Sequence, residues 1–348
     1  MIKYLLPYIV LTFILAISCK KKDIYKDAIT ITSSDFGEFI ELKGEQIDFD
    51  EIVYNPYKMI IKDSLLVIYN VRTEYAYQIF NLNTNKYLGE SVLIGNGPGE
   101  MIYLNFIQSN DRNIWLYDQE KAIVYEYDIQ TFIQTRSPLP KKTIYLDDRA
   151  EYLSIINDKI FSFKLYDNLN DNRFYIFDME GKISSSNGRF PSIDQNMTYE
   201  EINFGFTSEY STNFKDRILL SYRLTDLIEV YSLEGSLIKR IHGPEFFIPS
   251  VNEYKDESVS FANGTKEAKE AYFYPANAGD EVFITYSGEL FSKNVFHKKQ
   301  IYVFDWDGNP QRRYLLDIPI YGTIVDSQKR IIYGFSDIPE FHVVKFHY

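Results

Sequence analysis

The chain has 348 residues, with 49 acidic against 37 basic side chains and a formal net charge of −12. Because an acidic chain repels nucleic-acid phosphates, we exclude nucleic acid as an expected partner. The sequence contains 30 Tyr and 26 Phe, an enrichment in aromatic residues that favours β-strands. It contains a single cysteine, which excludes a disulfide framework.

The first residues are typical of an exported lipoprotein. Lys3 precedes an uncharged, mostly apolar run over residues 4–17, which is too short to span a bilayer comfortably and suits a signal peptide. The run ends in Ala16-Ile17-Ser18-Cys19, which resembles the lipobox, whose cysteine receives a diacylglycerol. We predict a signal peptide over residues 1–18, lipidation at Cys19 and a linker over residues 19–28. The alternative is a buried apolar element with an incidental cysteine.

Acyl chains on Cys19 would anchor the protein to a membrane that the chain does not span. An aspartate directly after the cysteine is the best-known signal for retention in the inner membrane, and Lys20 stands there instead. We therefore predict the outer membrane, with the periplasmic or surface face left open.

Residues 29–348 repeat one pattern of alternating apolar residues that ends in an aromatic and a polar turn. The six aromatic residues are separated by 42 to 54 residues, apart from one interval of 73. Such periods are typical of propeller blades. The six aromatics are Phe80, Tyr127, Phe177, Tyr231, Phe304 and Phe346.

A second strand-like run precedes each aromatic, as in residues 65–69 and 282–286. The pattern predicts an all-β fold, a six-bladed β-propeller of four-stranded antiparallel blades. The sixth blade runs out of chain before its fourth strand, so we expect Phe39-Ile40-Glu41-Leu42 to close the ring as an N-terminal strand, which would remove an exposed edge.

The longest interval contains a polar loop insertion at about residues 245–270. The run Lys266-Glu267-Ala268-Lys269-Glu270 suggests one or two helical turns within it. Long loops on a propeller often carry function, and the alternative is a solvated excursion.

Glycine-rich turns mark the boundaries between blades. Leu93-Ile94-Gly95-Asn96-Gly97-Pro98-Gly99-Glu100 follows the first blade, and His242-Gly243-Pro244-Glu245 follows the fourth. Together with the lipobox, the six blades and Tyr286-Ser287-Gly288, these turns resemble the TolB-like six-bladed β-propeller lipoproteins, relatives of NHL-type propellers. The resemblance implies a lipoprotein that faces the periplasm or the cell surface, with no assigned reaction.

We find no local catalytic or metal-binding motif. The four histidines, His242, His297, His342 and His347, fit no zinc spacing. Residues 95–100 could cradle a phosphate, but no helix pattern and no Lys-Ser/Thr follow them. Asp305-Trp306-Asp307-Gly308 fits a hairpin turn better than a calcium loop. We therefore predict no catalytic residue, no metal ligand and no cofactor, and leave open a divalent cation held by distant residues.

In a propeller, the turns between blades and the loops between second and third strands gather on one face. Arginine and tyrosine on that face suit carbohydrate or peptide recognition, because they combine flat surface with polar tips. The alternative is that they are ordinary loop residues. The predicted ligand-binding residues are Arg72, Glu100, Arg223, Asp226 and Tyr286.

Three functions are compatible with this sequence. The first, which we favour, is a binding or scaffold module for a glycan, a peptide or an envelope protein. The second is a metal-dependent hydrolase or lyase of the lactonase kind, with several Asp, Glu or Asn side chains around a cation on the axis. The third is a structural subunit that uses the insertion as its contact. Whether the protein is an enzyme is left open, with the absence of a motif favouring a binding role.

Overall fold

The computed structural model describes residues 24–97, 99–110, 112–165, 172–191, 193, 196–256, 259–291 and 298–348. The predicted signal peptide, Cys19 and His297 lie outside these ranges, so lipidation stays a prediction. Within them, none of the helices is both long and apolar enough to cross a bilayer.

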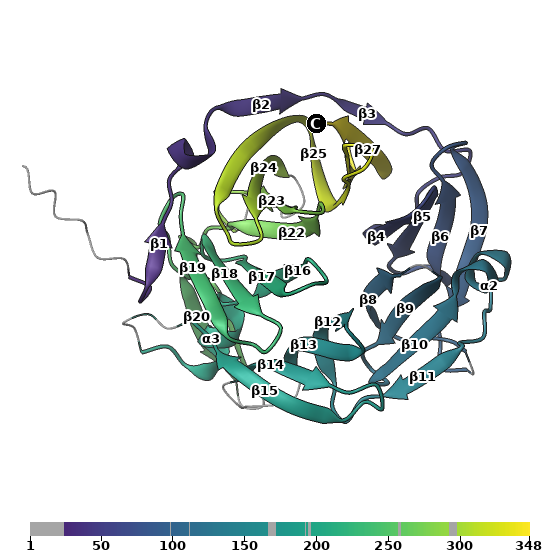
Figure 1. Cartoon of the computed structure of the whole chain (residues 1–348), viewed down its shortest axis with the longest axis horizontal. Helices are drawn as coiled ribbons and strands as arrows, with labels where there is room; N and C mark the ends of the chain where they lie inside the picture. Colours follow the sequence, from purple (N-terminus) through teal and green to yellow (C-terminus); the bar gives the residue numbers. More distant parts are fainter. Residues whose placement is uncertain are drawn as a thin grey trace, which may run out of the picture.

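The described strands form six antiparallel blades around a central channel (Figure 1), which confirms the predicted propeller. The first strand of each blade lies at the channel and the later strands lie progressively further out. The first three blades are β4 (Pro56–Lys62), β5 (Leu65–Asn70), β6 (Tyr75–Asn81) and β7 (Lys86–Leu93); β8 (Leu104–Ser109), β9 (Asn113–Asp118), β10 (Ile123–Asp128) and β11 (Lys142–Tyr145); β12 (Ala150–Ile156), β13 (Lys159–Leu165), β14 (Asn172–Phe177) and β15 (Ile183–Arg189).

The fifth and sixth blades share one long strand, because β25 pairs with β24 through its first part and with β26 through its second. The remaining blades are β16 (Ser208–Thr212), β17 (Arg217–Tyr222), β18 (Leu227–Ser232) and β19 (Leu237–His242); β22 (Tyr272–Asn277), β23 (Glu281–Tyr286), β24 (Lys298–Asp305) and β25 (Pro310–Asp326); and β25 again with β26 (Ile331–Ser336) and β27 (His342–His347).

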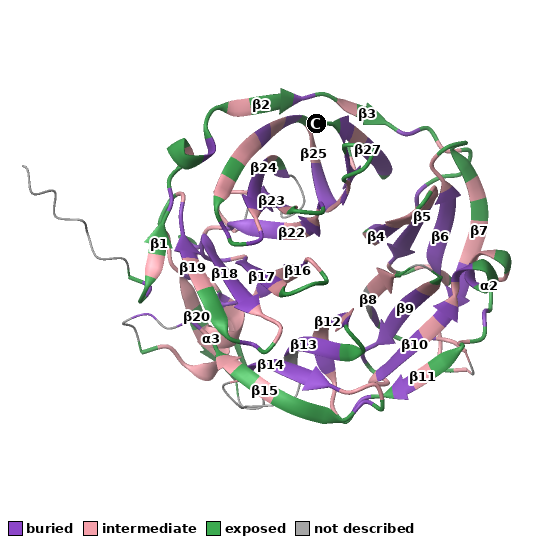
Figure 2. Ribbon diagram, viewed as in Figure 1, coloured by how far each residue is buried: buried purple, intermediate pink, exposed green. Residues whose placement is uncertain are grey.

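The hydrophobic core is a ring of side chains between neighbouring blades. One cluster of buried residues lies at each of the six contacts, including the contact between the last blade and the first. The second and third strands of the blades are almost wholly buried, whereas the outer strands carry exposed residues (Figure 2). Because both faces of a middle strand are covered, its apolar pattern is strong enough to be read from sequence.

The N-terminal segment runs around the outside of three blades (Figure 1). Strand β1 (Ala28–Thr30) pairs in parallel with β19, a 3-10 helix follows at Ser33–Phe36, and β2 (Phe39–Leu42) pairs in parallel with β25. Strand β3 (Gly44–Gln46) then pairs antiparallel with β27 and completes the sixth blade.

The ring is thus closed by an N-terminal strand, as predicted, but the expected segment was wrong. Gly44–Gln46 closes the sixth blade, and Phe39–Leu42 extends the fifth. A glycine is needed at the closing strand because a Cβ on Gly44 would lie 2.8 Å from a ring carbon of Phe346 and 2.9 Å from Val344. Apolar composition, which favoured Phe39–Leu42, gives no information on this close approach.

The insertion forms a β-hairpin, not the expected helical turns. Strands β20 (Val251–Lys255) and β21 (Ser260–Gly264) pack on helix α3 (Tyr199–Gly205), which joins the third and fourth blades. The run 266–270 is irregular, because Glu270 N–H donates to the Glu289 carbonyl at 2.9 Å and the Glu270 carbonyl accepts from Gly288 N–H. This pairing overrides local helix propensity. The other α-helix, α2 (Ile129–Gln134), precedes β11.

Candidate functional site

Glu100 folds back over the glycine turn that precedes it. Its carboxylate accepts a hydrogen bond from Gly97 N–H at 2.7 Å, and Lys121 donates to the Glu100 carbonyl at 2.7 Å. A Cβ on Gly95 would collide with the Glu100 carboxylate, so a larger residue here would have to displace that carboxylate from the turn. In the structure Glu100 holds the turn and does not line the channel.

Asp226 is fully buried and organises the turn after the fourth blade. Its two oxygens accept backbone hydrogen bonds from residues 245, 246 and 247 at 2.6, 2.7 and 3.1 Å. His242 Nε2 lies 3.1 Å from Asp226 Oδ1, and the His242 ring packs edge-on against Tyr25. A carboxylate with this many donors is a structural anchor of the loop.

Tyr286 and Arg72 occupy very different surroundings. Tyr286 is 2 % exposed and packs between Tyr272 and Tyr302, with ring centroids 5.0 Å away on each side. Arg72 is exposed, with a positive φ of 60°, in the loop between β5 and β6. Of the five predicted ligand residues, Arg223 is the one that lines the central channel.

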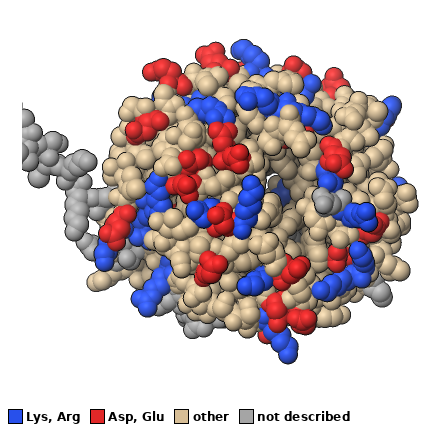
Figure 3. Space-filling model, viewed as in Figure 1, with Lys and Arg blue, Asp and Glu red and all other residues tan. Residues whose placement is uncertain are grey.

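The central channel is the candidate site that the described residues of all six blades form together. Its volume is about 520 Å³, and its wall is built from the innermost strands of all six blades, β4, β8, β12, β16, β22 and the second part of β25. Space-filling atoms leave a hollow at the centre of the disc, with both basic and acidic side chains around it (Figure 3). A cavity bounded by every blade is where a propeller can hold a small ligand.

Three tyrosines line the end of the channel at which the innermost strands begin, which we call the loop end. They are Tyr57, Tyr152 and Tyr274. Tyr152 and Tyr274 have φ of 55° and 50°, a left-handed conformation that non-glycine residues rarely adopt, and the register of β22 shifts beside Tyr274. Such strained positions cost about 1–3 kcal/mol each and cluster at functional sites.

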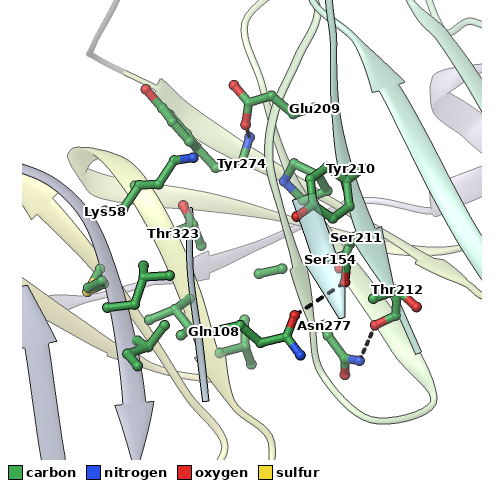
Figure 4. Close-up of a pocket in the computed structure, with 18 of the residues that line it drawn as sticks. Lys58, Gln108, Ser154, Glu209, Tyr210, Ser211, Thr212, Tyr274, Asn277 and Thr323 are labelled. Atoms are coloured by element: carbon green, nitrogen blue, oxygen red, sulfur yellow. Dashed lines mark hydrogen bonds between the residues drawn. The ribbon is translucent and has the colours of Figure 1, made fainter. Parts of the chain in front are cut away.

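Three charged side chains share the loop end with these tyrosines. Lys58 comes from β4, Glu209 from β16 and Arg223 from the residue after β17. Tyr274 N–H donates to Glu209 Oε2 at 2.8 Å, which ties the fifth blade to the fourth (Figure 4). Arg223 lies 4.9 Å from the centroid of the Phe273 ring.

Protein surrounds this end of the channel although water reaches it, so charges there are poorly solvated. Burial raises the pKa of Glu209, and Arg223, the Tyr274 N–H and Lys58 act in the opposite direction. Burial lowers the pKa of Lys58, opposed by Glu209. Burial also raises the pKa of Tyr57 to about 12. Groups perturbed by burial in a cleft are candidates for binding or chemistry.

Uncharged polar groups line the middle and the far end of the channel (Figure 4). Gln108 accepts from Ser154 Oγ at 3.3 Å and from the Ile155 N–H at 3.1 Å. Asn277 Nδ2 donates to the Thr212 carbonyl at 2.6 Å. These bonds cross from one blade to the next, so they fix the shape of the channel while leaving hydroxyl and amide groups on its wall.

The alternative of a metal-dependent hydrolase requires acidic side chains that converge. No group of three His, Cys, Asp or Glu side chains suited to a metal ion occurs among the residues that the structure describes. The carboxylate at the loop end, Glu209, faces two basic side chains, which is a poor ligand set for a cation.

Sequence reasoning missed most of the channel. Lys58, Glu209, Tyr152 and Tyr274 lie on innermost strands that are far apart in the chain and share no local motif. Register shifts also interrupt the innermost strands β4, β8, β22 and β25. The available signal was the polar composition of these strands, as in Ser208-Glu209-Tyr210-Ser211-Thr212, next to the apolar middle strands.

Comparison with known proteins supports the fold. A crystal structure of a member of the DUF4221 family from Bacteroides vulgatus aligns with a TM-score of 0.56 at 10% identity, covering 89% of this chain and 96% of that one. A protein of Bacteroides fragilis described as exported aligns with a TM-score of 0.54 at 12% identity, covering 92% and 98%. No curated protein matches by sequence. The family profile described as TolB-like 6-blade propeller-like matches residues 35–328, and the chain therefore belongs to that family.

Proposed function

We propose that this protein is a cell-envelope binding module that holds a glycan in its central channel. The observation that carries the proposal is the channel wall, where three tyrosines and three charged side chains adjoin hydroxyl and amide groups in one cavity. Tyrosine rings provide flat faces for sugar rings, and the polar groups can pair with sugar hydroxyls. The rigid wall, built from six blades, keeps these groups in place before a ligand arrives.

The envelope location rests on the N-terminal sequence. A signal peptide that ends at Cys19 would deliver a lipid-anchored protein, which we place at the outer membrane. Tyr25 is 1 % exposed, and its hydroxyl lies 2.9 Å from Thr225 Oγ1. At most about 20 Å of extended chain would therefore separate Cys19 from the fourth blade. The description of one structural neighbour as exported agrees with this placement.

A glycan-binding assay with matched tyrosine variants tests the proposal. Tyr57 is 44% exposed at the loop end of the channel, and Tyr145 is 68% exposed on outer strand β11. Y57A should weaken binding to a panel of neutral and acidic oligosaccharides, because a stacking surface is lost, whereas Y145A should bind like the wild type. If no oligosaccharide binds, or if both variants bind equally well, the channel is not a glycan site.

The hairpin of the insertion supports a second candidate, a contact with an envelope protein. Tyr254 and Phe261 are 46% and 50% exposed, and their rings stack with centroids 5.6 Å apart. Exposed aromatic pairs are common at protein interfaces. Partner recovery in a pull-down from envelope extracts should fall when both residues are replaced by serine, and undiminished recovery argues against this contact.

A further inference from the structure

Basic side chains outnumber acidic ones on the channel wall at the loop end. The buried pair of Glu270 and Lys298, whose carboxylate and amine lie 2.7 Å apart, is neutral as a unit. Glu209 compensates one positive charge of the two that Lys58 and Arg223 bring to the channel. Arg223 also lies 3.5 Å from Glu270, and Glu289 acts on Lys298, so carboxylates behind the wall partly compensate these cations. On the channel wall itself, two basic side chains face one carboxylate, in a chain whose net charge is −12.

Arg223 has hydrogen-bonding capacity that the protein does not use. Its Nε is buried and lacks a hydrogen-bond partner. Its Nη2 lies 3.5 Å from Glu270 Oε1, a longer distance than the 2.7 Å from Lys298 to the same carboxylate. The Phe273 ring packs against both Arg223 and Lys298, with its centroid 4.9 Å from the guanidinium and 4.4 Å from the amine. The guanidinium is thus held in place by stacking, with donors left for a ligand.

We propose that the glycan is acidic, and that Arg223 and Lys58 bind the carboxylate of a uronic acid at the loop end of the channel. This inference rests on the proposed function, because it names the ligand class of the same site. A planar guanidinium can pair with a carboxylate through two parallel hydrogen bonds, and a lysine amine adds a third. The sugar ring attached to that carboxylate would then lie among Tyr57, Tyr152 and Tyr274.

Glu209 stands beside the two cations as a positioning residue. Its bond from Tyr274 N–H fixes the carboxylate against the wall, where it keeps Lys58 and Arg223 from repelling each other in the empty channel. A ligand carboxylate adds a second negative charge to the two cations. The added charge raises the pKa of Glu209 further, and it also raises the pKa of Lys58 back toward its ordinary value. Binding should therefore be stronger at lower pH, where both groups keep their protons.

Calorimetric titration with short oligogalacturonates and with their methyl esters tests the inference. The ester has the same sugar without the charge, so it isolates the carboxylate. We expect the wild type to bind the acid more tightly than the ester, and R223M to weaken acid binding about 10- to 100-fold while leaving ester binding nearly unchanged. R313M is the matched control, because Arg313 also stacks on a phenylalanine, at 4.0 Å from the Phe39 ring, but on the outside of the propeller.

K58M provides a second variant in case R223M fails to fold, and it should weaken acid binding in the same direction. Equal affinity for acid and ester overturns the acidic ligand but leaves glycan binding intact. Binding of neither probe to the wild type overturns both proposals. Tighter binding of an acidic peptide than of the oligogalacturonate would assign the carboxylate site to a peptide, and would overturn the uronic acid.

Discussion

Replacing Asp226 with asparagine should sharply destabilise the protein, because one carboxylate holds the turn after the fourth blade. Three backbone N–H groups reach its oxygens at 2.6, 2.7 and 3.1 Å, and His242 Nε2 lies at 3.1 Å. Asparagine keeps one oxygen and places an NH2 group against donors. Each hydrogen bond to a charged acceptor contributes about 1.5–3 kcal/mol, so losing two should cost about 3–6 kcal/mol.

Urea unfolding monitored by tryptophan fluorescence measures this cost. The midpoint should fall in D226N with little change in the slope, since the surface exposed on unfolding stays the same. D216N is the control. Asp216 is exposed in the turn between β16 and β17, at the opposite face of the propeller, and its carboxylate lies 2.9 Å from the Arg217 guanidinium. Its effect should be below about 1 kcal/mol. A D226N variant within about 1 kcal/mol of the wild type would refute the anchoring role of the carboxylate.

Three further predictions concern closure, the channel and the first glycine turn. G44V should lower the unfolding free energy by about 1–3 kcal/mol through overpacking against Phe346. E45A on the same strand removes only a solvent-accessible ion pair with Lys345 and should cost less than about 1 kcal/mol; equal stability of the two would contradict closure by β3. Because the pKa of Glu209 is raised, the folded protein binds a proton more tightly than the unfolded chain does, so E209Q should gain stability relative to the wild type as the pH rises above about 4. A difference that stays flat with pH contradicts the pKa direction. G95A should displace the carboxylate of Glu100 and cost about 1–2 kcal/mol, but in the background of E100A it should cost less, and additivity in the double-mutant cycle would exclude this collision.

The blades could be predicted from the sequence because their middle strands are buried on both faces. Strands such as Leu65–Asn70 and Ile331–Ser336 show a continuous apolar pattern that only burial explains. The closing strand could not be identified in the same way. Gly44-Glu45-Gln46 has little intrinsic preference for a strand, and its place is decided by the space beside β27.

The channel could be predicted only in outline. The loop face was inferred from propeller geometry, and Arg223 was identified on it. Glu100 and Asp226 follow strands on that face, yet the backbone already occupies both carboxylates. Glu100 accepts a hydrogen bond within its own turn, and Asp226 accepts three from the turn after the fourth blade. A sequence shows that a charged residue follows a strand, but not whether the neighbouring backbone has already captured it. The pairing of Lys58 with Glu209 depends on ring closure, which brings distant innermost strands together.

The most direct test of the central claim is a crystal structure of the protein with a bound oligogalacturonate. We expect the sugar inside the channel, with a carboxylate within hydrogen-bonding distance of Arg223 and a sugar ring against at least one of Tyr57, Tyr152 and Tyr274. A sugar bound on the β20–β21 hairpin or on the outer strands, with the channel free of ligand, would contradict the account.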